Sequence, residues 1–254
     1  MSRSLAASEM HGCAPRAIDP WLRRLDRVGG LSEAERLMVA RLVGPVEIAP
    51  MGRDLVGAGT KPGHAWVLVS GWACRQRLLP DGRRQILDLL LAGDMIGLPP
   101  DDAALAASWT VCLTRAELID AEPLRRFLAD TPEQHPAIAR AVRALARSVE
   151  ARLLNHVVRL GRLTAYERVG HLLLELHDRL RDAGLADGQA FPMPLTQETL
   201  ADALGLSVVH VNRVLQQLRR DRLIDLHAGR ASLLEPTLLA KICDFSPMSG
   251  GPIT

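Results

Sequence analysis

The clearest hydrophobic pattern in the chain has a helical period and covers two segments near its C-terminal end. Thr196 can cap a helix over residues 197–204, and Gly205 supplies the left-handed backbone that ends it. Ser207 can cap a second helix over residues 208–220. The apolar positions of this second helix recur at spacings of three and four: Val211, Val214, Leu215 and Leu218. The pattern therefore predicts two helices joined by a tight turn.

After these helices the pattern changes to short β-prone runs. Residues 224–225 and 232–234 flank the sequence HAGR, which predicts a hairpin with glycine in its turn. The polar face of the second helix carries arginine, asparagine and glutamine, the side chains that can bond base edges in a major groove. The candidate DNA contacts are Thr196, Gln197, Ser207, Val208, Val209, His210, Asn212, Arg213, Gln217 and Arg230. The alternative interpretation is an ordinary solvated helix face.

From residue 46 to residue 97, glycines punctuate short β-prone runs, a pattern typical of an all-β sandwich or roll. The expected strands include residues 66–69, 72–79, 84–91 and, further on, 109–113. Along residues 72–78, Trp72, Cys74 and Leu78 share one face and two arginines share the other, which predicts a half-buried wall. The candidate pocket of this roll comprises Trp72, Cys74, Leu87, Leu89 and Gly97.

Helices are expected before and after the roll. A short helix can begin at Asp19, and Ser32 with Glu35 resembles a capping box for the next one. A long helix over residues 137–160 carries an apolar seam: Ile138, Val142, Leu145, Val149 and Leu153. Arginines 140, 143, 147, 152 and 159 are expected on its outside. The seam has two interpretations, a homodimer interface and a core within one chain.

Composition narrows the class of protein. The 254 residues suit one large domain or two modest ones, and 48% of them are hydrophobic. The whole chain carries a net charge of +2, whereas residues 207–230 hold five arginines and two aspartates. A local basic patch on a nearly neutral protein is the expected footprint of phosphate binding. Aromatic residues make up only 3%, which argues against recognition of single strands by base stacking.

The C-terminal stretch LTQETLADALGLSVVHVNRVLQQLRRDRLIDLHAGRASLL resembles the winged helix of the Crp/Fnr superfamily of bacterial transcription regulators. The upstream stretch WVLVSGWACRQRLLPDGRRQILDLLLAGDMIGL resembles the sensor roll of that family. The resemblance implies an α+β protein with an N-terminal β-roll (jelly-roll-like) sensor domain, a long dimerisation helix and a C-terminal winged helix-turn-helix. The expected divisions are a tail over 1–18, the roll over 19–131, the dimerisation helix over 132–161, the DNA-binding domain over 162–246 and a tail over 247–254.

The resemblance also implies partners and roles. The partners are double-stranded DNA with a palindromic operator and a second copy of the chain, and RNA polymerase is a further candidate. Arg213 aligns with an arginine that contacts a guanine. Val209 falls where many relatives carry a glutamate, and valine can only touch a thymine methyl group or leave the position unread.

No cofactor is expected. Cyclic-nucleotide-binding relatives carry a glutamate after the glycine that matches Gly97 and an arginine further on, whereas Leu98 follows here and residues 85–114 contain no lysine or arginine. Haem-binding relatives use cysteine and histidine where this chain has Met95. An iron–sulfur cluster needs several N-terminal cysteines, and only Cys13 lies there. No metal site is expected either, because His171 and His177 are six residues apart on a predicted helix.

The sequence therefore predicts a transcription regulator controlled through its roll by an unidentified effector. The alternatives are a DNA-binding regulator with an empty roll, and a module that recognises a ligand or protein without binding DNA. An enzyme is not expected, because the phosphate-binding, nucleophile-elbow and zinc-protease motifs are absent. Without a signal peptide or a long apolar run, the protein is expected in the cytoplasm and off the membrane.

Overall fold

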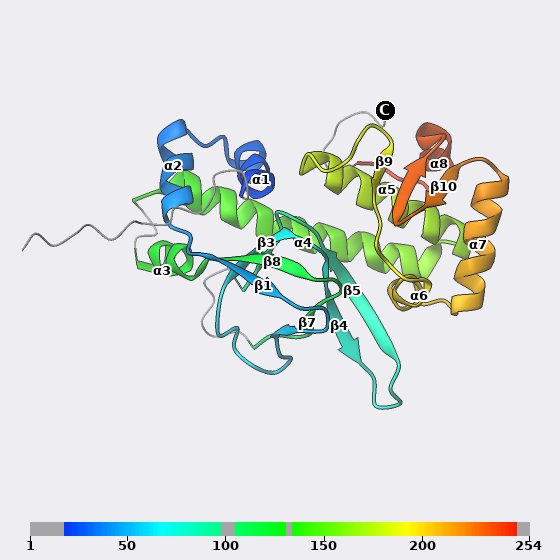
Figure 1. Ribbon diagram of the computed structural model, residues 1–254, viewed down its shortest axis with the longest axis horizontal. Coiled ribbons are helices and arrows are strands. Elements are labelled where there is room, and N and C mark those ends of the chain that lie inside the picture. Colours follow the sequence, from blue (N-terminus) through cyan, green and yellow to red (C-terminus); the bar gives the residue numbers. More distant parts are fainter. Residues whose placement is uncertain (1–17, 98–104, 131–133, 248–254) are drawn as a thin grey trace, which may run out of the picture.

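The computed structural model describes residues 18–97, 105–130 and 134–247 (Figure 1). Most of both expected tails, Cys13 and the three residues after Gly97 lie outside these ranges. Two helices come first, α1 (Asp19–Gly29) and α2 (Glu33–Arg41). The predicted capping box of α2 is present: the Ser32 hydroxyl accepts from the Glu35 N–H at 3.3 Å, and the Ser32 N–H donates to the Glu35 carboxylate at 2.8 Å.

The roll consists of two antiparallel four-stranded sheets within the described residues. One sheet has the order β1-β8-β3-β6 and the other β2-β7-β4-β5. The bounds are β1 (Val46–Ala49), β2 (Asp54–Val56), β3 (Trp66–Ser70), β4 (Ala73–Leu78), β5 (Arg84–Leu90), β6 (Met95–Ile96), β7 (Trp109–Cys112) and β8 (Ala116–Asp120). The core between the sheets includes Leu68, Leu90, Ile96 and Leu118.

Trp72, just before β4, and the face of β4 that carries Cys74 do not point into the roll. Cys74 and Leu89 pack in one core with residues of the C-terminal helices, whereas Ala73 faces the interior of the roll. A bulge between Arg75 and Gln76 interrupts the strand, and Leu78, expected on the apolar face, is 51% exposed. The sequence pattern identified the two faces but not the element that covers the apolar one.

Helix α3 (Glu122–Asp130) leads to the long helix α4 (Pro136–Arg162), which runs behind the roll (Figure 1). The structure corrects the prediction of a homodimer seam on α4 for three of its five residues. Ile138, Val142 and Leu145 are at most 6% exposed and pack against α1 and the roll of the same chain. The further seam residues, Val149 and Leu153, line cavities on that same side. The intramolecular interpretation therefore holds for Ile138, Val142 and Leu145, whereas the assignment of the half-buried Val149 and Leu153 to a dimer interface stays a prediction.

The C-terminal part begins with α5 (Ala165–Asp182), which Thr164 caps. The two predicted helices, α6 (Gln197–Leu204) and α7 (Val208–Arg220), have the predicted bounds. Strands β10 (Ile224–His227) and β11 (Arg230–Leu233) form the predicted hairpin. A strand and a helix that the sequence did not predict complete this part, β9 (Ala190–Pro192) beside β11 and α8 (Pro236–Ile242) against α5. None of the described helices is long and apolar enough to span a membrane.

Candidate DNA interface

The turn between α6 and α7 is fixed by local capping contacts. The Thr196 hydroxyl accepts from the Thr199 N–H at 3.1 Å, and the Ser207 hydroxyl accepts from the His210 N–H at 3.2 Å. Gly205 has a φ of 62°, and its N–H donates to the Ala201 carbonyl. A side chain at this position would be strained, because left-handed backbone favours glycine. These contacts set the direction in which α7 leaves α6.

Helix α7 has one buried face and one exposed face. Val211, Val214, Leu215 and Leu218 are at most 7% exposed and pack in the core with α5 and α6. Val209 is 69% exposed, and Asn212 and Arg213 are exposed beside it. Helix α7 therefore presents a polar ridge to solvent on a rigid apolar base.

A shallow concave surface of about 470 Å³ follows this ridge. Its lining contains five of the predicted contacts, Gln197, Val208, Val209, Asn212 and Arg213, together with Gln216 and Arg220. The Asn212 amide donates to the Gln197 side-chain carbonyl at 3.0 Å, which ties α7 to the start of α6. The side chain of Arg213 has no ion pair or hydrogen bond with any described residue, so its guanidinium is available to a ligand.

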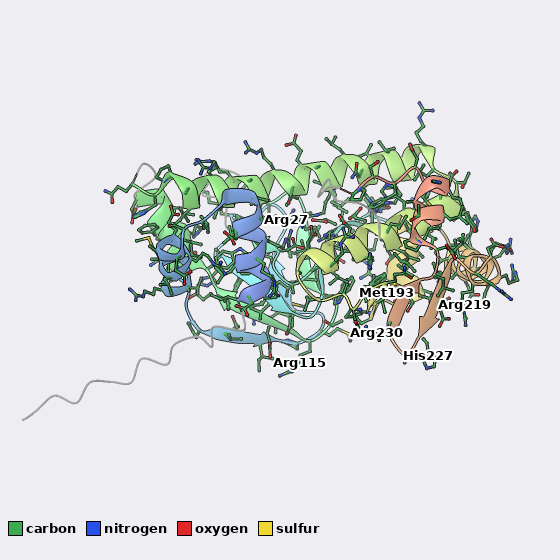
Figure 2. The ribbon with its side chains drawn as sticks, turned by 90° about the horizontal axis from the view of Figure 1, so that it is seen from above. Arg27, Arg115, Met193, Arg219, His227 and Arg230 are labelled. Carbon is green, nitrogen blue, oxygen red and sulfur yellow. The ribbon has the colours of Figure 1, made fainter. Side chains whose placement is uncertain are left out.

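Two of the predicted contacts are placed differently from the rest. Gln217 is half-buried, and its amide donates to Asp221 at 2.8 Å, so it faces the C-terminal end of α7 and does not line the concave surface. Arg230 lies on the wing, next to the turn formed by Ala228 and Gly229. Both turn residues have positive φ, at 48° and 74°, as a two-residue hairpin of this kind requires. Figure 2 shows His227 and Arg230 on the wing hairpin.

Side chains of α5 hold α6 and α7 in place. The Arg168 guanidinium donates to the Leu204 carbonyl at the end of α6, at 3.2 Å. The Tyr166 hydroxyl donates to Asp221 after the end of α7, at 2.7 Å. Helix α5 therefore contacts both helices of the turn and helps to set the orientation of α7.

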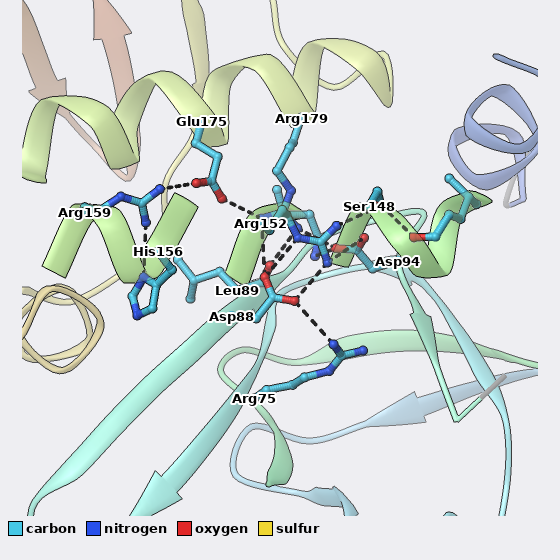
Figure 3. A network of polar contacts seen from close by, with 12 residues as sticks. Arg75, Asp88, Leu89, Asp94, Ser148, Arg152, His156, Arg159, Glu175 and Arg179 are labelled. Carbon is cyan, nitrogen blue, oxygen red and sulfur yellow. Dashed lines mark hydrogen bonds and ion pairs between the residues drawn. The ribbon is translucent and has the colours of Figure 1, made fainter. Parts of the chain in front are cut away.

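A buried network of ion pairs connects α5 to the roll and to α4 (Figure 3). Asp94 lies 2.7 Å from both Arg24 and Arg179, and the Asp88 carboxylate receives two hydrogen bonds from Arg152. Burial would raise the pKa of Asp94, but the surrounding arginines outweigh it and hold that pKa well below its usual range. The Asp94 carboxylate is therefore charged, and the contacts of both carboxylates bind the roll to the helices.

A second part of the network lies further along α4. The Arg159 guanidinium contacts Glu175 and donates to Nδ1 of His171, at 3.2 Å from Nη2. Burial, and then the charge of Arg159, lower the pKa of His171 to about 4. Arg152 and Arg159 were expected on the outside of α4, but they are 3% and 2% exposed. Asp88 gave a usable signal in the sequence, since it stands alone in the apolar run ILDLLL.

The roll also contacts α6 directly. The Arg84 guanidinium on β5 lies 2.7 Å from the Asp202 carboxylate on α6. Trp72, Cys74 and Leu89, expected in an effector pocket, contribute instead to the apolar core shared with α5 and α6. Only Leu87 and Gly97 of the predicted pocket line a cavity of the roll. Three of the five predicted pocket residues therefore connect domains and do not contact that cavity.

Two arginines line this cavity, contrary to the expectation drawn from residues 85–114. Residues 85–114 contain no lysine or arginine, but β4 lies outside that stretch and places Arg75 and Arg77 at the cavity. Cys74, Cys112 and Cys243 are buried and form no disulfide, and burial raises the pKa of the Cys74 thiol to about 12. Among the described residues, no group of three or more histidine, cysteine, aspartate or glutamate side chains could hold a metal ion.

The fold and the exposed helix define a winged helix-turn-helix protein with a β-roll. A family model described as a Crp-like helix-turn-helix domain matches residues 167–242. The nitrogen fixation regulation protein FixK of Bradyrhizobium diazoefficiens is 34% identical over 63% of this chain and 65% of its own length. The transcriptional activator protein FnrL of Cereibacter sphaeroides is 30% identical over 70% of this chain and 72% of its own.

A solved structure agrees with the sequence matches. FixK2 from Bradyrhizobium japonicum has a TM-score of 0.69 and 26% identity, and the match covers 79% of this chain and 98% of that one. The chain belongs to the Crp/Fnr superfamily of bacterial transcription regulators. Both the predicted fold class and the predicted family are confirmed.

Proposed function

We propose that the protein binds a palindromic operator as a homodimer, with α7 in the major groove, and that the roll regulates this binding. The observation that carries the proposal is that α7 has one buried apolar face and one exposed polar face. Val211 and Leu218 are fully buried, whereas Val209 is 69% exposed and Arg213 lies beside it. A helix anchored in this way can insert its polar face into DNA without unfolding. Exposed Val209 offers only a methyl contact to a base edge.

The C-terminal half of α4 supports a dimer. Leu154, Val157 and Val158 are 61%, 66% and 56% exposed, and their spacing of three and four residues places them on one face of the helix. Exposed apolar side chains grouped on one helix face favour burial against a second helix. Pairing of α4 with its copy would place two recognition helices on one face of the duplex, as two half-sites about 34 Å apart require.

The contacts of the roll support regulation. Asp88 and Asp94 of the roll bind arginines of α4 and α5, and Arg84 binds Asp202 of α6. An effector that shifts β5 therefore acts on the elements that hold α7. The protein would act in the cytoplasm, where the chromosome lies, and it would have no catalytic role.

Salt-dependent DNA binding tests the proposal. The fluorescence anisotropy of a labelled random-sequence duplex should rise on addition of protein, and the logarithm of the binding constant should fall linearly with the logarithm of the salt concentration. Binding that is absent at low salt would favour the alternative of a module that recognises a ligand or protein. Thermal stabilisation by a compound from a cell extract would distinguish a regulated roll from an empty one.

A further inference from the structure

A cavity of about 470 Å³ lies between the roll and α4. Its apolar wall includes Val56, Leu87 and Ile96 from the roll and Leu153 from α4. The polar atoms in its lining belong to Arg75, Arg77, Ser108 and Thr110. Ligand sites are typically concave and apolar with a few converging polar groups, and this cavity has that composition.

Arg75 and Arg77 both reach the cavity from β4. No carboxylate is found among the described residues that line the cavity. The guanidinium of Arg77 has no hydrogen bond or ion pair with any described residue, and that of Arg75 has only a 3.7 Å contact with Asp88. Two neighbouring guanidinium groups repel each other, so an anion between them relieves the repulsion and gains charge-assisted hydrogen bonds.

We propose that this cavity binds a small organic anion, whose charged group is held by Arg75 and Arg77 and whose apolar body packs on Leu87, Ile96 and Leu153. The inference rests on the proposed function, because it names the ligand class of the regulating roll. Guanidinium groups suit carboxylate, sulfonate and phosphate groups through paired N–H donors. The apolar wall selects a ligand with a hydrocarbon body over a free inorganic anion.

Arg75 connects the cavity to the DNA-binding part. Its guanidinium lies 3.7 Å from Asp88, which receives two hydrogen bonds from Arg152 and lies 4.0 Å from Arg179 on α5 (Figure 3). An anion that draws Arg75 toward the cavity leaves Asp88 to the arginines of α4 and α5. Occupation of the cavity thereby changes the charge balance around α5, the helix that positions α7.

A matched pair of fluorescent probes tests the site on the full chain. The anion 8-anilinonaphthalene-1-sulfonate and the neutral N-phenyl-1-naphthylamine share one aromatic body and differ in the sulfonate. The sulfonate probe should bind once per chain. Its dissociation constant should rise about tenfold or more in Arg77→Gln and further in Arg75→Gln/Arg77→Gln, because charge-assisted hydrogen bonds are lost. The neutral probe should bind these variants as it binds the wild type.

Two further variants locate the site. Ala107→Trp places a large side chain at the cavity from an exposed position, so it should weaken binding of both probes. Arg83→Gln removes the same charge from the neighbouring turn, where Arg83 pairs with Asp81, and should change neither. Circular dichroism melting verifies that each variant is folded.

The outcomes separate this inference from the proposed function. Absence of saturable sulfonate binding, equal losses of both probes in Arg77→Gln, or unchanged binding in Ala107→Trp would each overturn the anion site. Loss of DNA binding alongside normal, arginine-dependent probe binding would instead refute the proposed regulator and leave the anion site standing.

Discussion

Arg152 on α4 and Asp88 on β5 form a bidentate ion pair between the long helix and the roll. Arg152 Nε lies 3.1 Å from Asp88 Oδ1, and Nη2 lies 2.9 Å from Oδ2. Both side chains are 3% exposed. Removal of one partner from such a buried pair leaves the other charge without compensation, which is strongly destabilising. The pair therefore holds the roll against the helix that connects it to the DNA-binding part.

Asp88→Asn should lower the free energy of unfolding by about 3–5 kcal/mol, since Arg152 and Arg179 lose a nearby negative charge. Urea unfolding monitored by circular dichroism measures the change. Asp81→Asn is the matched control, because Asp81 is an exposed carboxylate paired with Arg83 at the β4–β5 turn. If both variants unfold like the wild type, the buried network does not stabilise the arrangement of the domains.

Val157→Arg should convert dimers into monomers without loss of stability. Val157 is 66% exposed in the single chain, so an arginine costs little there and places paired charges at the proposed interface. Sedimentation velocity measures the mass of the assembly. Leu37→Arg, at a 52% exposed position on α2, is the control and should remain dimeric.

Leu145 gives the contrasting variant for assembly. It is buried within its own chain, so Leu145→Ala should lower the free energy of unfolding by about 2–5 kcal/mol and leave the dimer intact. A Val157→Arg protein that sediments as a dimer would show that the exposed end of α4 is not the interface. A monomeric but stable Leu145→Ala protein would place the interface at the N-terminal half of α4.

The bounds of α6 and α7 could be predicted from the sequence because their determinants are local. Thr196, Gly205 and Ser207 act within one helical turn of their own positions. The partners of an apolar face are not local. Cys74 and Ile138 were rightly expected in apolar surroundings, but periodicity does not state whether the roll, another helix or a second chain covers them.

The buried ion pairs could not be predicted from the sequence, because their partners are also not local. Asp88 and Arg152 are 64 residues apart, and Asp94 and Arg179 are 85 apart. The arginines of α4 look like a solvated face in the sequence, because the carboxylates that pair with them come from another element. Arg75 and Arg77 were identified as one polar face, but only the packing of β4 shows that this face meets a cavity.

Stability should depend on pH between 7 and 5 through His171. Burial and Arg159 lower the pKa of His171 to about 4 in the folded protein, below its usual value. The unfolded chain therefore binds a proton first as the pH falls, and stability is lost between about pH 6.5 and pH 4. The free energy of unfolding should drop by about 2 kcal/mol from pH 7 to pH 5 on this account.

Urea unfolding at both pH values checks the His171 prediction. His171→Gln should lose less stability than the wild type over this interval, and His227→Gln, at an exposed position on the wing, should behave like the wild type. Equal losses in the wild type and in His171→Gln would contradict a neutral buried His171 in contact with Arg159 and near Glu175.

Millimolar cyclic AMP should change neither the melting temperature nor the affinity for DNA. Leucine follows Gly97 where cyclic-nucleotide-binding relatives carry glutamate, and the described lining of the cavity offers only the hydroxyls of Ser108 and Thr110 to a ribose. Arg75 and Arg77 would tolerate the phosphate, so the experiment tests recognition of the sugar and base. A saturable shift in melting temperature at micromolar nucleotide would refute the prediction.

In the proposed function α7 reads DNA sequence through its exposed face, and Arg213 tests this most directly. An operator is first selected from random DNA with the wild-type protein, and the affinities of Arg213→Ala for this operator and for a random duplex are then measured by anisotropy at one salt concentration. Arg83→Ala, which removes the same charge from the turn between β4 and β5, is the control. The predicted result is a loss of about 1–3 kcal/mol per half-site on the operator and little change on random DNA. Equal losses on both duplexes would contradict the claim, because Arg213 would then contact only phosphates.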